Sequence, residues 1–116
     1  QTCALPIFRY FEIAREALLN QFNYGYRQMK ASGYLWPVVD TRVKYRNALT
    51  FEQRIRVRAR IKEFENRLRI DYDIFDAETG KRATTGYTIQ VAVDEKSREL
   101  CFVSPDILFE RMGVTP

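Results

Sequence analysis

Residues 54–62 alternate basic and apolar side chains without a break, and this pattern most limits the folds open to the chain. Successive side chains of a β-strand point to opposite faces, so a period of two predicts a strand with one apolar and one basic face. The apolar side chains are Ile55, Val57, Ala59 and Ile61, and the basic ones are Arg54, Arg56, Arg58, Arg60 and Lys62. A sheet of such strands needs another element to cover its apolar face.

The same period predicts about five antiparallel strands, at 38–46, 51–65, 67–76, 83–94 and 99–103. Residues 76–80 predict a hairpin turn, because Gly80 can adopt a positive φ. The inward faces of two of these strands are expected to carry Leu68, Ile70, Tyr72 and Ile74, and Tyr87, Ile89, Val91 and Val93, respectively.

One long helix is available to cover this sheet. From Phe8 onward, apolar residues recur at helical spacing on one face, namely Phe11, Ala14, Leu18 and Phe22. A short helix is expected at 26–32, where Gly33 ends it, and a closing helix is expected after Pro105 with Ser104 as its N-cap. The sheet is expected to curl around the helix at 8–22.

The composition limits the kinds of catalytic site that this chain can form. The 116 residues are enough for one domain, and they include no histidine, which excludes a Ser-His-Asp or Cys-His arrangement within this chain. The two cysteines, Cys3 and Cys101, lie far apart in a sequence without a secretion signal, so we expect reduced thiols in a cytoplasmic protein and no metal site. No apolar run reaches the length of a membrane span, and the net charge of +4 favours an anionic partner.

Several segments resemble one family. FRYFEIAREALL, the later YGY and GYLWPVV pieces, and GYTIQVAVD resemble acyl-CoA thioesterases of the 4-hydroxybenzoyl-CoA thioesterase type, over roughly residues 8–112. The most specific piece runs from Arg9 to Arg15. The resemblance implies an α+β hot-dog fold, in which an antiparallel sheet of about five strands wraps around one central helix. It also implies hydrolysis of an acyl-CoA thioester to free acid and coenzyme A without a cofactor, by a homodimer or homotetramer.

The resemblance stops abruptly before Phe8. In the family, a motif with the catalytic Asp leads into the central helix, and that motif is missing from residues 1–7. We therefore predict a non-family lead-in at 1–7 and a hot-dog thioesterase domain at 8–116. The alternative to an active thioesterase is a catalytically impaired fragment of such an enzyme.

Without that Asp, Glu12 is the candidate catalytic acid, because a carboxylate can activate water for attack on a thioester. The other interpretation is that Glu12 pairs with Arg9 or Arg15 and stabilises the helix. Phe8, Tyr10 and Phe11 are candidate substrate contacts, although these aromatic residues also suit a core or a dimer interface.

Coenzyme A carries phosphates, and Arg58, Arg60, Lys81 and Arg82 are the candidates to bind them. Two other interpretations of the basic stripe at 54–62 remain. In the first, the stripe is a solvated outer face of the sheet and pairs with Asp71 and Asp73 across the strands. In the second, the stripe makes the chain an anion- or nucleic-acid-binding module. Nucleic acid is the least favoured partner, because no known nucleic-acid motif accompanies the stripe.

Overall fold

The computed structural model describes residues 4–47 and 54–113, with side chains from residue 7 onward. Three helices and six strands follow one another in the order α1 (Ala4–Gln21), α2 (Tyr26–Ala31), β1 (Tyr34–Leu35), β2 (Val38–Tyr45), β3 (Ile55–Glu63), β4 (Leu68–Asp76), β5 (Arg82–Gln90), β6 (Val93–Asp94) and α3 (Asp106–Met112). The helix-then-strands order expected from the sequence is confirmed.

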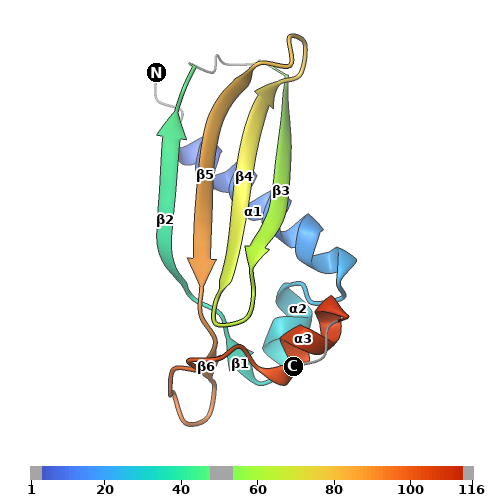
Figure 1. Cartoon of the computed structure of the whole chain (residues 1–116), viewed down its shortest axis with the longest axis vertical. Helices are drawn as coiled ribbons and strands as arrows, with labels where there is room; N and C mark the ends of the chain where they lie inside the picture. The colour runs from blue at the N-terminus through green and yellow to red at the C-terminus, as the bar shows by residue number, and fades with distance from the viewer. Residues whose placement is uncertain (1–3, 48–53, 114–116) are drawn as a thin grey trace.

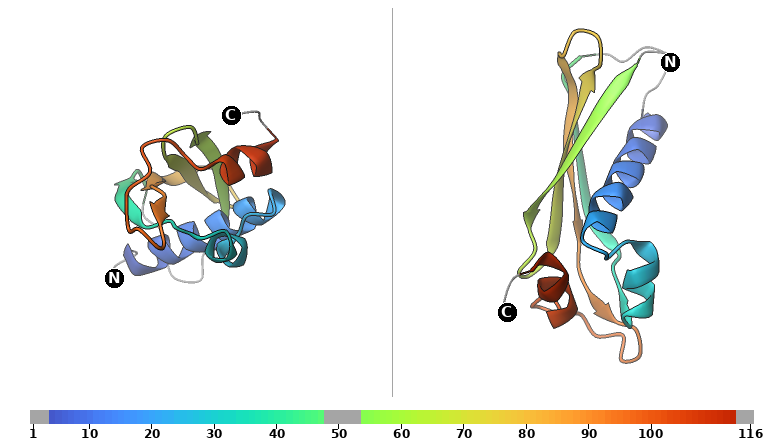
Figure 2. Two further views of the ribbon diagram at one scale, coloured as in Figure 1. Left: turned by 90° about the horizontal axis from the view of Figure 1, so that it is seen from below. Right: turned by 90° about the vertical axis from the view of Figure 1, so that its right-hand side faces the viewer.

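The main sheet is antiparallel and has the strand order β2-β5-β4-β3, while β1 and β6 form a small separate sheet. Helix α1 lies across one face of the main sheet, and α2 and α3 lie at one end of it (Figures 1 and 2). The opposite face of the four strands carries no helix along its length in the described part of the chain (Figure 2). The sheet therefore has a helix face and an outer face.

The core forms between α1 and the helix face. Phe11 of α1 stacks on Tyr72 of β4, with ring centroids 4.3 Å apart and an interplanar angle of 10°. Around this pair the buried apolar side chains of α1 and β4 are Ile7, Leu19, Leu68, Ile70 and Ile74. The predicted inward faces of β3 and β4 are confirmed, since apolar residues of β3 are half-buried while its basic residues are exposed.

The predicted inward face of β5 is wrong. The strand register pairs Tyr87 with Asp71 and Ile89 with Arg69, which places both on the outer face. The helix face of β5 carries Thr84, Gly86, Thr88 and Gln90 instead. Hydrogen bonding stabilises Thr88 in this position, because the hydroxyls of Thr88 and Tyr72 lie 2.8 Å apart. The buried Thr84 hydroxyl has no hydrogen-bond partner in the described part of the chain. The strand also ends at Gln90, and the chain resumes as β6 after a two-residue break.

Helix α1 begins at Ala4, four residues before the predicted start. Pro6 lies in its first turn, where a missing N–H costs no helical hydrogen bond, and Ile7 is fully buried in the core. Glu12 therefore lies two turns into the helix, and the first turn holds no acidic residue. The division of the chain at residue 7 stays a prediction.

Two predictions near the C-terminus are wrong. Residues 99–103 form no strand; their only β contact is an isolated bridge between Leu100 and Val93. The N-cap of α3 is Pro105, and the Ser104 hydroxyl has no hydrogen-bond partner in the described part of the chain. The Ser104 N–H instead donates to the carbonyl of Glu65 at 2.8 Å, which ties this segment to the β3–β4 turn.

Position 86 requires glycine, because the structure leaves no room for a side chain there. A Cβ at this position would lie 2.8 Å from Cε2 of Phe11 and would also collide with the carbonyl oxygen of Arg42. The backbone cannot retreat, because Gly86 pairs with β2 on one side and with β4 on the other.

We expect Gly86→Ala to lower the free energy of unfolding by about 1–3 kcal/mol, the usual cost of overpacking a core. Urea denaturation followed by circular dichroism measures this change. Thr85→Ala, on the outer face of the same strand, is the control and should change stability little. An unchanged denaturation midpoint for Gly86→Ala would contradict the close approach of α1 to β5.

Candidate functional site

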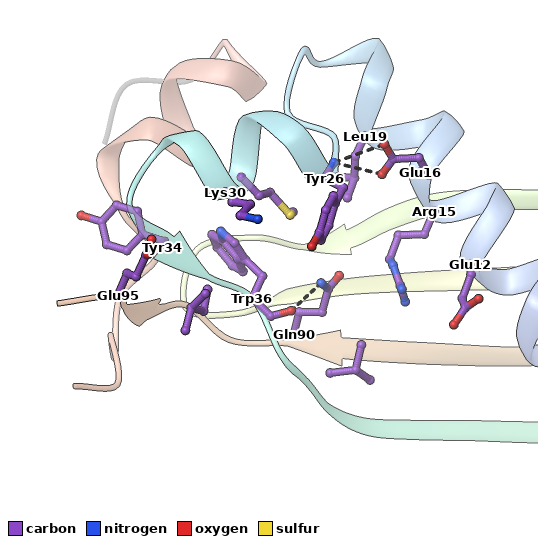
Figure 3. A pocket seen from close by; sticks show the side chains of 13 residues that line it. Glu12, Arg15, Glu16, Leu19, Tyr26, Lys30, Tyr34, Trp36, Gln90 and Glu95 are labelled. Atoms are coloured by element: carbon purple, nitrogen blue, oxygen red, sulfur yellow. Dashed lines mark hydrogen bonds between the residues drawn. The ribbon is translucent and has the colours of Figure 1, made fainter. Parts of the chain in front are cut away.

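A pocket of about 320 Å³ lies where α1, α2, β1 and the end of β5 meet (Figure 3). Its walls are mainly apolar and include Leu19, Met29 and Trp36. Charged side chains also line it, among them Glu12 and Arg15 of α1. An apolar cavity with a few polar groups at one side is typical of a small-molecule site.

Hydrogen bonds hold the aromatic wall of this pocket. The indole Nε1–H of Trp36 donates to the hydroxyl of Tyr24 at 3.1 Å, and that hydroxyl lies 2.8 Å from Oγ of Ser32. Ser32 in turn donates to the carbonyl of Met29 at 2.6 Å. On the other side, the amide Nε2 of Gln90 donates to the carbonyl of Trp36 at 2.9 Å (Figure 3). The wall is therefore built before any ligand enters.

Glu16 has a structural role in this arrangement. Its carboxylate accepts hydrogen bonds from the Tyr26 N–H at 3.0 and 3.2 Å, which holds the start of α2 against α1 (Figure 3). Glu12 is the other α1 carboxylate that lines the pocket, and its role as the catalytic acid stays a prediction.

Glu12 lies at the rim of the pocket with its side chain 57% exposed. Its carboxylate lies 3.8 Å from the Arg9 guanidinium, so of the two pairings considered from the sequence, the one with Arg9 is present. Eight residues separate Glu12 from the start of α1, which is about 12 Å along a helix axis. The free N–H groups of the helix terminus are therefore too distant to act on the same atoms as Glu12.

Arg15 is a pocket residue that the sequence analysis did not select. It is half-buried, and its guanidinium extends from α1 toward the pocket (Figure 3). No carboxylate in the described residues lies within ion-pair distance of it. Its spacing of three from Glu12 on the helix was the available signal, because residues at i and i+3 share a face.

The three predicted substrate contacts lie elsewhere on α1. Phe8 is 44% exposed, Tyr10 is half-buried, and Phe11 is buried against Tyr72. None of them lines the pocket described above. Their role in substrate binding stays a prediction.

The predicted coenzyme A contacts lie on or beside the outer face. Arg58 and Arg82 both bind the buried carboxylate of Asp73, at 2.9 and 3.3 Å, while Arg60 and Lys81 are exposed. The cross-strand pairing expected with Asp73 is confirmed, whereas Asp71 pairs with Arg69 of its own strand at 2.9 Å. Binding of coenzyme A by these four cations stays a prediction.

Two further features of the described residues bear on function. No group of three or more carboxylates or cysteines among them could hold a metal ion. No helix in the described part of the chain is long and apolar enough to cross a membrane.

Residues 6–109 match the model of the Thioesterase-like superfamily. The chain belongs to this superfamily. The match covers nearly the whole domain, including α1, the main sheet and the pocket, and the predicted family resemblance is confirmed. The fold is the expected α+β hot-dog fold, with α1 as the central helix. No curated protein matches the chain.

Solved structures with this fold include several thioesterases. DHNA-CoA thioesterase from Staphylococcus aureus is 26% identical, with a TM-score of 0.73 over 83% of this chain, which spans 64% of that protein's length. The 1,4-dihydroxy-2-naphthoyl-CoA thioesterase from Synechocystis is 17% identical, with a TM-score of 0.79 over 93% of this chain and 80% of that one. A hypothetical protein from Staphylococcus aureus, solved in complex with CoA, is 16% identical, with a TM-score of 0.69 over 90% and 68% of the two chains.

Tyr72 lies in the core, interacts with Arg15 and gives the fold a dependence on pH. Burial raises the pKa of its phenol above the usual 10.0, while the hydrogen bond with Thr88 and the charge of Arg15 oppose this rise. Because this pKa is higher in the folded protein than in the unfolded chain, the neutral phenol makes its full contribution to stability at any pH below the pKa of the unfolded chain. This contribution is lost as the pH rises through the folded pKa.

We expect wild-type protein to lose more unfolding free energy between pH 8 and pH 11 than Tyr72→Phe does, as measured by urea denaturation at both pH values. Tyr72→Phe should itself be less stable at pH 8, by about 1–3 kcal/mol, because Thr88 loses a buried partner. Exposed Tyr26→Phe is the matched control. Equal losses in wild-type and Tyr72→Phe would show that this phenol does not carry the dependence.

Proposed function

We propose that this protein is an acyl-CoA thioesterase, which hydrolyses an acyl-CoA thioester to free acid and coenzyme A. The observation that carries the proposal is that Glu12 and Arg15 line the same apolar pocket, on the central helix of a thioesterase-like fold. The solved thioesterases with the same fold support the reaction class.

The acyl group occupies the pocket in this proposal. A cavity of about 320 Å³ lies at the small end of the range for ligand sites, roughly 300–1,000 Å³. Leu19, Met29 and Trp36 offer apolar surface to the acyl group. A single aromatic ring or a short aliphatic chain therefore fits better than a long one.

Glu12 acts as the general base. Its carboxylate takes a proton from a water molecule, whose oxygen attacks the thioester carbonyl carbon. The C–S bond then breaks, coenzyme A leaves as a thiolate, and the proton passes to the sulfur. The exposure of Glu12 suits this role, because water reaches its carboxylate directly.

Arg15 stabilises the charge that develops on the thioester carbonyl oxygen. Its guanidinium has no competing carboxylate in the described residues. It hydrogen-bonds the neutral phenol of Tyr72, and its remaining N–H donors can bind that oxygen. Partial burial strengthens this interaction, because fewer water molecules screen the charge. Arg15 therefore replaces the helix terminus, which lies too far from Glu12 for a shared substrate atom.

We expect Glu12→Gln to lower kcat for hydrolysis of benzoyl-CoA and hexanoyl-CoA by about 10²–10⁴-fold, the usual range for a lost general base. We expect Arg15→Met to lower kcat by about 10²–10³-fold, as for a lost oxyanion donor. Release of coenzyme A, followed with a thiol reagent, measures both.

Glu110→Gln and Arg27→Met make the same chemical changes at exposed sites on α3 and α2, and should leave hydrolysis unchanged. Full activity of Glu12→Gln would exclude Glu12 as the base. No hydrolysis by wild-type protein, despite binding of the acyl-CoA, would favour the alternative of a catalytically impaired chain.

We propose that the active form is a homodimer joined through β2. Among the described residues this strand is an unpaired edge of the sheet, and it exposes Val38, Val39 and Tyr45. Nearby, α1 begins beside β2, crosses behind the other three strands (Figure 1) and exposes Phe8 and Ile13. An exposed, apolar edge strand is a common site of pairing with a second chain.

We expect light scattering after gel filtration to give about twice the chain mass of 13.8 kDa for the wild type. Val39→Lys with Tyr45→Lys should yield a monomer, because charge at an edge strand opposes pairing. Leu100→Lys, at an exposed site in a loop, is the control and should stay dimeric. A dimer that survives the β2 substitutions would place the interface elsewhere.

A further inference from the structure

The outer face of the main sheet contains a second cavity that the proposed hydrolysis does not use. An open hollow of about 450 Å³ lies on this face, which is turned away from α1 (Figure 2). Its lining includes Thr85, Gly86 and Tyr87 of β5, together with residues of β2, β3 and β4.

Part of the positive charge around this hollow is neutralised within the sheet. Asp71 binds Arg69, and Asp73 binds both Arg58 and Arg82. The Arg69 guanidinium also lies over the Tyr87 ring, 4.2 Å from its centroid. These contacts fix three of the guanidinium groups and use both aspartates.

Four further cations at the hollow have no such partner. They are Arg42, Lys44, Arg46 and Arg60, and no carboxylate of the described residues lies within ion-pair distance of any of them. Arg42 and Lys44 come from β2, and Arg46 directly follows this strand. Like charges gathered around one concavity repel each other, so an anion bound there would relieve an existing strain.

The strand register sets the spacing of these arms. Arg60 pairs with Asp71, Asp71 with Tyr87, and Tyr87 with Arg42, which forms one row across the four strands. Three strand spacings separate the ends of this row, roughly 14 Å. Long arginine side chains on the two edge strands can therefore reach the same ligand over the hollow.

We propose that this hollow binds a phosphate-rich anion of nucleotide size, held by Arg42, Lys44, Arg46 and Arg60. Several phosphate oxygens are needed to satisfy four cations, and arginine binds phosphate through two parallel hydrogen bonds. The hollow is closed off from the acyl pocket by the sheet, so the site stands whether or not the proposed hydrolysis is correct. Two sources carry this chemistry, namely the nucleotide end of coenzyme A and a free nucleotide.

Isothermal titration of the full chain with pyrophosphate, ADP and coenzyme A tests the site. We expect all three to bind, and the double variant Arg42→Gln/Arg60→Gln to weaken each by about tenfold or more. Both residues are exposed on edge strands, so the fold should survive their substitution. The control Arg27→Gln/Lys96→Gln removes the same charge from exposed positions away from the sheet and should bind as wild type does.

Each outcome decides the proposal. If coenzyme A binds more tightly than ADP, the site is assigned to coenzyme A. If the two bind equally, the site is assigned to a free nucleotide. Both results support the proposal. If the control variant loses as much affinity for the anions, the loss comes from the lower net charge of the protein, and the proposed site is wrong. Binding of an oligonucleotide alone, with no binding of the three small anions, would also overturn it in favour of a nucleic-acid surface.

Discussion

The contact of Phe11 with Tyr72 and Gly86 fixes how α1 lies on the sheet, and the rest of the structure depends on it. The two rings are nearly parallel at 4.3 Å, and the absence of a side chain at Gly86 lets Phe11 approach the sheet. Such a stacked pair contributes about 0.5–1.5 kcal/mol beyond the burial of its area. Its geometric effect is larger, because it sets the rotation of α1. With Phe11 held inward, Arg15 follows one turn later at the edge of the buried stripe and reaches the pocket.

The main sheet separates two chemically different sites, and strand alternation produces both. On the helix face, the side chains pack against α1 and close the apolar pocket. On the outer face, the same strands present arginines and a lysine around a hollow. Only about 5 Å separates neighbouring strands, so a few basic residues per strand create a dense positive surface. Asp71 and Asp73 offset part of this charge, and the repulsion that remains is what an anionic ligand would remove.

The sequence predicted some elements and missed others for identifiable reasons. The inward faces of β3 and β4 followed from strict alternation of charged and apolar residues. That rule failed for β5, where Thr84 and Thr88 lie under the helix and Tyr87 lies outside. Thr88 is buried there because its hydroxyl has the Tyr72 hydroxyl as a hydrogen-bond partner. Glu12 was found as an acid in a helical pattern. Arg15 was missed, because the packing of α1 on the sheet decides which charged side chains of the helix line a cavity.

The sequence by itself determined the fold class and the family, because periodicity of two, periodicity of 3.6 and the α1 motif are local properties of the chain. It also determined which residue types were available, and the lack of histidine directed attention to carboxylates. Only the tertiary structure decided that α1 begins at Ala4, that Glu12 and Arg15 share the rim of one pocket, and that the cations of β2 join Arg60 around the outer hollow. These facts depend on strand order and register, which bring together residues far apart in the sequence.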